Sequence, residues 1–145
     1  MKTMLAIKNS SEKGKSSTTL ELANLMKETP DCKIIFPREP LPILIGDFTL
    51  VIEINDKIVA FESQGDPGTD IENRLESIIT MYNPNLIFCT CRTRGATVTA
   101  VEDIAHKYTY DIIWTSTYET NHSQNVVNKL KAEHLQDLVI KLGLI

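Results

Sequence analysis

The chain has 145 residues, of which 42% are hydrophobic and 23% are charged. This length supports one hydrophobic core but would leave two domains too small, so we expect a single domain over residues 1–145. Its 19 acidic and 15 basic side chains give a formal charge of −4, and no long basic block indicates binding to nucleic acid or to an anionic membrane. No apolar run approaches the ~20 residues that span a bilayer. Three cysteines are an odd number that does not suit a disulfide framework, so we expect a cytoplasmic protein.

Apolar runs of strand length alternate along the chain with segments of helical period. The predicted elements, in chain order, are a strand at about 2–8, a helix at 15–28, strands at 33–36, 48–54 and 57–62, a helix at 69–82, a strand at 85–90, a helix at 96–108, a strand at 111–116 and a helix at 123–142. Such alternation is typical of a parallel sheet with helices on both faces. It predicts the α/β class, as a three-layer α/β/α sandwich with a mostly parallel sheet.

The strand order is predicted from the connections. Asn55-Asp56 separates two strand-like runs, which predicts a tight hairpin and makes 48–54 an antiparallel edge strand. Strand 2–8 is expected at the centre of the sheet, with 57–62 and 85–90 beside it and 111–116 outside. Cys89 and Cys91 are expected as buried core side chains on their strand. In the last helix the apolar stripe expected to face the core is Val127, Leu130, Leu135, Leu138 and Leu142.

The segment Asn9-Ser10-Ser11-Glu12-Lys13-Gly14-Lys15-Ser16-Ser17 follows the first predicted strand and precedes the first predicted helix. Backbone N–H groups at a helix N-terminus favour anions, and a glycine there lets a ligand approach closely. The segment resembles the phosphate-binding loop of P-loop NTPases, Gly-x-x-x-x-Gly-Lys-Ser/Thr, with Asn9 in place of the first glycine. Asparagine tolerates left-handed backbone angles, so this replacement is compatible with the turn.

The resemblance implies ATP and Mg²⁺ as cofactors. The residues that it places around the phosphates are Asn9, Lys13, Gly14, Lys15, Ser16 and Ser17. Lys15 would reach the β- and γ-phosphate oxygens, and the Ser16 hydroxyl would ligate the metal. The alternative is a polar connection between strand and helix that happens to contain Gly-Lys-Ser.

A second segment, Ile58-Val59-Ala60-Phe61-Glu62-Ser63-Gln64-Gly65, resembles the strand that carries the metal-side acid in P-loop GTPases and related ATPases. The resemblance implies that Glu62 holds the metal through a water and that the Gly65 N–H senses the γ-phosphate. Glu53 is not expected in this role, because it lies on the hairpin strand that runs the opposite way and should end up far from Ser16. Asp66 is an equally placed carboxylate, and Gln64 is a candidate for orienting an attacking water. The alternatives are that Glu62 is the solvated end of a strand and that Gln64 is an exposed loop residue.

Two arginines, Arg92 and Arg94, follow the strand predicted at 85–90. Ligands collect at the carboxyl edge of a parallel sheet, so either guanidinium could neutralise transition-state charge or clamp a second substrate. The alternative is a solvated loop, and the same alternative is favoured for Arg38 in the proline-rich stretch 29–47. The guanine-reading pattern Asn-Lys-x-Asp is not found near Arg94, so adenine is favoured over guanine.

These residues together predict a Mg²⁺-dependent, ATP-binding P-loop NTPase that hydrolyses ATP or transfers its γ-phosphoryl group. One alternative is a degenerate nucleotide-binding or partner-binding module with little or no catalysis. Another is a small-molecule kinase, in which Arg92 and Arg94 would serve as lid arginines. The sequence leaves a homodimer or a protein partner open.

Overall fold

The computed structural model describes residues 2–10, 14–38 and 47–145. The elements are β1 (Thr3–Lys8), α1 (Lys15–Lys27), β2 (Lys33–Phe36), β3 (Thr49–Ile54), β4 (Lys57–Glu62), α2 (Ile71–Tyr82), β5 (Leu86–Cys91), α3 (Ala96–Tyr108), β6 (Asp111–Thr115) and α4 (Gln124–Lys141). Each bound lies within two residues of its predicted place. In the part of the chain that the structure describes, no helix combines the length and the apolar composition needed to cross a bilayer.

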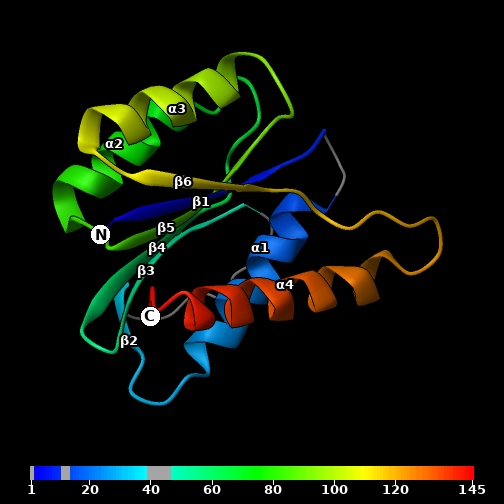
Figure 1. Ribbon diagram of the computed structural model, residues 1–145, viewed down its shortest axis with the longest axis horizontal. Helices are drawn as coiled ribbons and strands as arrows, with labels where there is room; N and C mark the ends of the chain where they lie inside the picture. The colour runs from blue at the N-terminus through cyan, green and yellow to red at the C-terminus, as the bar shows by residue number, and fades with distance from the viewer. Residues whose placement is uncertain (1, 11–13, 39–46) are drawn as a thin grey trace.

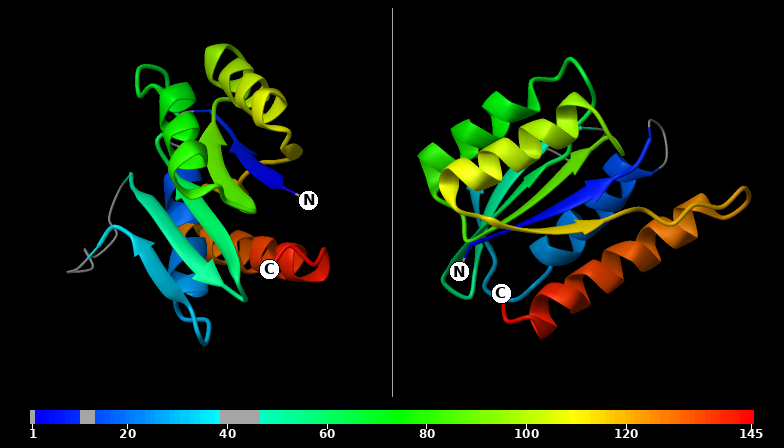
Figure 2. Two further views of the ribbon diagram at one scale, coloured as in Figure 1. Left: turned by 90° about the vertical axis from the view of Figure 1, so that its left-hand side faces the viewer. Right: turned by 45° about the horizontal axis from the view of Figure 1, so that its top comes forward.

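The six strands form one mixed sheet in the order β2-β3-β4-β5-β1-β6. Helices α1 and α4 cover one face of this sheet and α2 and α3 cover the other, which gives three layers (Figures 1 and 2). The α/β class is therefore confirmed. The hairpin is also confirmed, because β3 and β4 pair antiparallel around a turn in which Asn55 and Asp56 both have positive φ angles of 52° and 63°.

The predicted strand order is wrong in two places. β5 lies between β1 and β4, so the strand carrying Glu62 is not a neighbour of β1, which pairs with β5 and β6. One helical crossover, α2, joins β4 to β5, and strands connected in this way tend to be neighbours. β3 is not the edge strand, because β2 pairs with it and occupies the edge itself. The proline-rich surroundings of β2 gave no indication of that pairing.

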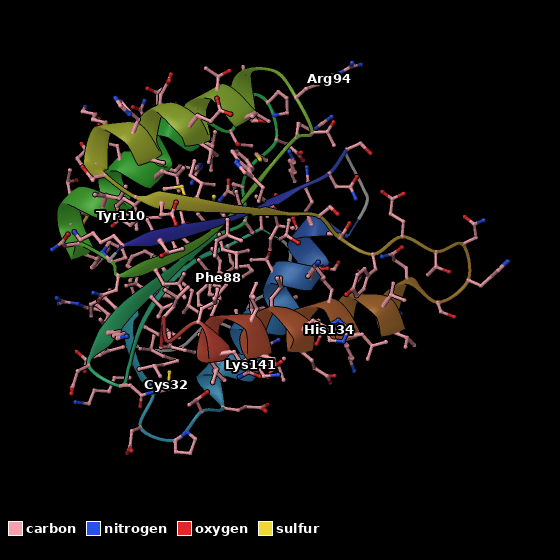
Figure 3. The ribbon with its side chains drawn as sticks, in the orientation of Figure 1. Cys32, Phe88, Arg94, Tyr110, His134 and Lys141 are labelled. Carbon is pink, nitrogen blue, oxygen red and sulfur yellow. The ribbon has the colours of Figure 1, made fainter. Side chains whose placement is uncertain are left out.

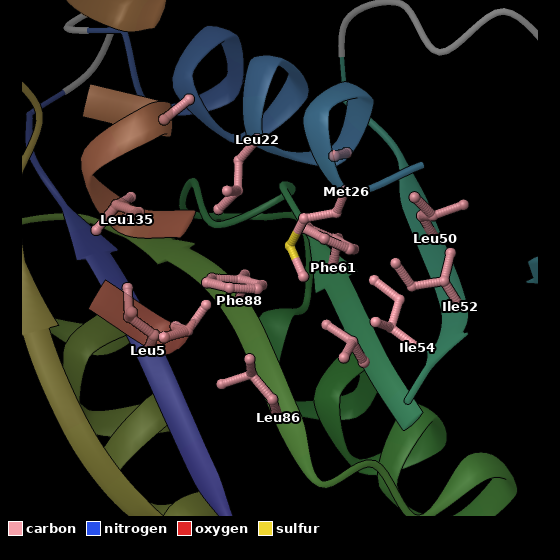
Figure 4. Close-up of a cluster of buried hydrophobic side chains, with 14 of the residues drawn as sticks. Leu5, Leu22, Met26, Leu50, Ile52, Ile54, Phe61, Leu86, Phe88 and Leu135 are labelled. Atoms are coloured by element: carbon pink, nitrogen blue, oxygen red, sulfur yellow. The ribbon is translucent and has the colours of Figure 1, made fainter. Parts of the chain in front are cut away.

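Two hydrophobic clusters hold the layers together. On the side of α1 and α4, Phe61 and Phe88 stack with ring centroids 5.0 Å apart beneath Leu22 and Met26 (Figure 4). On the side of α2 and α3, the strands contribute smaller side chains, among them the buried Cys89 and Cys91. The predicted core role of Cys89 and Cys91 is therefore confirmed.

The apolar stripe predicted for the last helix is only partly correct. Leu135 is buried, but Leu130 and Leu142 are 41% and 53% exposed. The face of α4 that is buried consists of Asn128, Ala132, Leu135 and Val139. α4 packs against α1, and the distance between two packed helices depends on the size of the side chains at their contact. The buried face of α4 therefore includes the small Ala132, whereas the apolar pattern predicted a face made of large side chains.

Candidate functional site

The candidate site lies where the parallel strands β1, β4 and β5 end, at the right of Figure 1. The register of β1 and β5 brings Lys8 opposite Cys91, and Glu62 at the end of β4 lies opposite Cys89. The loops that follow these strands therefore leave the sheet at one edge, beside the first turn of α1. Because β3 runs the opposite way, its beginning reaches the same edge, with Thr49 paired to Glu62.

Gly14 sets the start of α1. It is the N-cap in the left-handed conformation, with φ 83°, whereas Asn9 does not have a positive φ. A Cβ atom on Gly14 would lie 2.7 Å from Asn128 Oδ1 and 3.0 Å from Gln124 Nε2. Among the described residues, no side chain caps this helix and its first turn has no acidic residue. The positive end of the helix dipole is thus left without a negative side chain of its own.

Lys15 and Arg92 converge on one carboxylate. The Lys15 side chain is only 6% exposed, and its ammonium group donates to Asp66 Oδ1 at 3.0 Å and to the Asn9 carbonyl oxygen at 3.1 Å. Arg92 Nε donates to the same Asp66 Oδ1 at 2.9 Å. Partial burial alone would raise the pKa of Asp66, but the hydrogen bonds and charges of Lys15 and Arg92 outweigh it and lower that pKa. A single anionic oxygen therefore lies between two cations at this edge.

Ser16 has a carboxylate partner that the sequence analysis missed. Its hydroxyl donates to Asp47 Oδ1 at 2.6 Å. Asp47 stands just before β3, and only the reversed direction of β3 brings it to this edge. No motif in the sequence marks it. Glu53, by contrast, lies opposite Ile58 and forms an ion pair with Lys33 at 3.7 Å.

Glu62 is buried rather than solvated, at 1% exposure. Its Oε1 accepts a hydrogen bond from Thr49 Oγ1 at 2.7 Å, and its Oε2 accepts one from the Gln64 N–H at 3.2 Å. Burial raises the pKa of Glu62, although these two hydrogen bonds and the charge of Arg74 act against the increase. Alternate β4 side chains face opposite layers: Phe61 belongs to the cluster under α1, and Ala60 to the cluster under α2. Glu62 accordingly lies on the α2 side.

Gly65 is required by close packing. A Cβ atom there would lie 1.8 Å from the carbonyl oxygen of Thr90 in β5. Thr90 Oγ1 also donates to the Ser63 carbonyl oxygen at 2.7 Å, which fixes the loop against β5. Gln64 is half-buried. This packing orients the chain so that Asp66 faces Lys15.

Asn9 connects two loops. Its Nδ2 donates to Thr117 Oγ1 at 2.6 Å and to Glu119 Oε1 at 2.8 Å, and its Oδ1 accepts from the Ser10 N–H at 2.7 Å. Its side chain therefore holds the segment after β6 against the start of the loop after β1. Neither Thr117 nor Glu119 was expected from the sequence.

The remaining predicted site residues form no side-chain hydrogen bond or ion pair with Lys15, Asp66 or Arg92 in the part of the chain that the structure describes. Arg94 is exposed and points away from the body of the molecule (Figure 3). Arg38 is exposed as well, and Ser17 lies exposed on the first turn of α1. Lys13 lies outside the described residues.

The described residues include no group of three His, Cys, Asp or Glu side chains that could hold a metal ion. Burial raises the pKa of the Cys91 thiol to about 11, although Lys15 and Lys8 lower it in part, so this sulfur stays protonated at neutral pH. The acceptors near the start of α1 are the carboxylates of Asp47 and Asp66 and the carbonyl oxygen of Asn9.

Comparison of the chain with protein-family models, with curated proteins and with solved structures gave no match in any of the three.

Proposed function

We propose that this protein binds ATP with Mg²⁺, with the phosphates at the N-terminus of α1 between Lys15 and Arg92. The observation that carries the proposal is the convergence of these two cations on Asp66 Oδ1, at 3.0 and 2.9 Å. The Asp66 side chain is 46% exposed, so a ligand can reach it and displace it. Its carboxylate occupies the position that we assign to a phosphate oxygen.

Each part of the proposed phosphate site has a physical role. The uncapped N-terminus of α1 offers backbone donors and a favourable dipole. Lys15 supplies a nearly buried point charge, and Arg92 supplies a planar guanidinium that can contact two phosphate oxygens. Gly14 permits the left-handed conformation at the start of α1, where a side chain would meet Asn128 and Gln124.

The oxygen donors at this edge fit Mg²⁺, which prefers hard oxygen ligands and keeps several waters. We assign the Ser16 hydroxyl and the Asp47 carboxylate to it, because they lie 2.6 Å apart beside the first turn of α1. Glu62 lies on the α2 side of the sheet, and the negative charge of Asp47 contributes to its raised pKa, so the two carboxylates interact. When bound, the metal would offset the negative charge of the phosphates.

For turnover, we propose that Arg92 stabilises the charge that develops on the γ-phosphoryl group and that Gln64 orients the acceptor or a water. The chain would then hydrolyse ATP or transfer its γ-phosphoryl group. A binding module with little turnover is the second candidate, and the observation that favours it is Asn9. Its side chain is occupied by Thr117 and Glu119, in a position that the resembling family gives to glycine.

Calorimetric titration with ATP, GTP and ADP, each with and without Mg²⁺, tests the proposal. We expect ATP to bind more tightly with Mg²⁺ than without it, and more tightly than GTP. Phosphate release measured on the same samples separates the two candidates, since a binding module would bind ATP without releasing phosphate. Absence of binding by all three nucleotides would contradict both.

A further inference from the structure

A pocket of about 330 Å³ opens between α2 and the strands β2, β3 and β4. Its walls are largely apolar, from Phe36 at the end of β2 and from Ile78, Met81 and Tyr82 on α2. Glu62 lines it as well, and so does Arg74 from the first half of α2. The volume falls at the small end of the range for ligand sites, which are concave, mostly apolar and furnished with a few polar groups.

The two charged groups of the pocket do not satisfy each other. No Arg74–Glu62 ion pair lies within 4.0 Å among the described residues, although the charge of Arg74 lowers the pKa of Glu62. Arg74 Nε donates to the Thr69 carbonyl oxygen at 2.6 Å, which fixes the guanidinium, while its Nη groups have no acceptor in the described part of the chain. Each Glu62 oxygen accepts one hydrogen bond and retains a further lone pair. The pocket therefore presents donors and an acceptor to whatever occupies it.

We propose that this pocket binds a neutral aromatic amide or lactam, whose N–H is accepted by Glu62 and whose carbonyl oxygen accepts from Arg74. The rings of Phe36 and Tyr82, with centroids 6.3 Å apart and planes at 46°, and the flexible Met81 thioether provide an apolar surface for the ring of such a molecule. An anion or a cation would be attracted by one of these two groups and repelled by the other, whereas a neutral amide can hydrogen-bond to both. A purely apolar molecule would leave both groups without new partners in a drier pocket.

The inference does not depend on the proposed nucleotide site. The pocket lies under α2, whereas Lys15 and Ser16 belong to α1 on the opposite face of the sheet. The two sites are linked through Glu62, which lines the pocket and whose pKa is raised by Asp47, yet each site has its own ligand contacts. Binding to the pocket can therefore be measured without nucleotide, and neither result decides the other.

Benzamide, benzoate and benzamidine test the chemistry, because they share one shape and differ in charge and in donors. With ¹³C-methyl-labelled methionine, the 70% exposed Met81 reports on the pocket, while Met4 and Met26, both fully buried, report on the two hydrophobic clusters. We expect a saturable shift of the Met81 methyl signal with benzamide, at a dissociation constant in the millimolar range or below, as befits so small a ligand. Benzoate and benzamidine should bind at least several-fold more weakly.

Arg74→Leu should weaken benzamide binding about tenfold or more, since it removes a hydrogen bond from a charged donor. The matched control, Lys141→Leu, removes an exposed cation on α4 and should leave binding unchanged. Unshifted Met4 and Met26 signals in both variants show that the fold persists. The proposal is overturned if benzamide gives no saturable Met81 shift in the millimolar range. It is also overturned if benzoate or benzamidine binds as tightly as benzamide, or if Arg74→Leu binds benzamide as tightly as the parent.

Discussion

Lys15 Nζ and Asp66 Oδ1 lie 3.0 Å apart, although 51 positions separate the two residues in the chain. The contact joins the first turn of α1 to the loop that follows β4, across the intervening strand β5. It gives the nearly buried ammonium group an anionic partner that a phosphate could replace.

If Asp66 competes with phosphate for Lys15 and Arg92, Asp66→Asn should strengthen ATP binding measured without Mg²⁺. Two partly exposed ion pairs of about 0–1 kcal/mol each would be relieved, so the gain should be at most about 2 kcal/mol, or roughly thirtyfold in affinity. Calorimetry on this variant and on Asp103→Asn, which changes an exposed carboxylate on α3, measures it. Weaker binding confined to the Mg²⁺ condition would instead make Asp66 a metal-side acid.

Replacing each of the two arginines after β5 by alanine should have very different effects on phosphate release. Arg92→Ala removes a guanidinium that already lies in the site, and we expect phosphate release to fall by ~10³-fold or more while ATP affinity falls much less. Arg94→Ala should leave both quantities unchanged, because Arg94 is exposed and points outward. Steady-state phosphate release and calorimetry on the two variants supply the comparison. Equal effects of the two changes would contradict the assignment.

Glu62 should give the protein a distinctive pH dependence. Burial raises its folded-state pKa, despite the opposing hydrogen bonds from Thr49 and Gln64. The folded protein then keeps a proton that the unfolded chain releases, so stability falls as pH rises from the ordinary value of 4.5 through the folded-state pKa. Glu62→Gln lacks this proton, and its free energy of unfolding relative to the parent should increase over that interval.

Urea unfolding of both proteins at a series of pH values measures this difference. The lowered pKa of Asp66 acts with the opposite sign, with stability lost as pH falls, but it is common to both proteins and cancels. The altered hydrogen bonds of Glu62→Gln can change its free energy of unfolding by a constant amount, but this does not affect the pH dependence of the difference. A difference that does not change with pH would show that Glu62 titrates as in the unfolded chain.

Gly14→Ala should destabilise the fold for two separable reasons. A left-handed conformation costs a residue with a Cβ atom about 1–2 kcal/mol, and here the Cβ would also meet Asn128 Oδ1 at 2.7 Å. Gly68→Ala is the matched control, because Gly68 has a φ of 87° with nothing within 4 Å of its Cβ position. Thermal unfolding should show a larger loss for Gly14→Ala, and Asn128→Ala should reduce the excess. Equal losses at the two glycines would remove the steric part of the explanation.

The elements could be predicted from the sequence because each depends on a local pattern. The alternation of Ile, Val and Phe in β4 and the Asn55-Asp56 turn are readable without knowledge of distant residues. The strand order could not be predicted in the same way. The pairing of β2 with β3 joins segments that are distant in the chain, such as Lys33 and Glu53, and no local periodicity indicates it.

The residues of the candidate site also differ in whether a local sequence pattern indicates them. Gly14, Lys15 and Ser16 were recognised because they are contiguous, and Asp66 and Arg92 because they follow strands. Asp47 and Asn128 were missed, since the first reaches Ser16 only through the reversed direction of β3 and the second reaches Gly14 only through the packing of α4 on α1. A buried asparagine on a helix resembles an ordinary surface residue until its neighbours are known.

The affinity of the Lys15→Ala variant for ATP, measured by calorimetry with Mg²⁺, tests the proposed nucleotide site most directly. Loss of a charge-assisted contact to phosphate should cost about 1.5–3 kcal/mol, or roughly tenfold to a hundredfold in affinity. Lys27→Ala, at the opposite end of α1, should bind ATP like the parent. If Lys15→Ala is folded and binds ATP as tightly as the parent, the phosphates do not lie at the N-terminus of α1 and the account is contradicted.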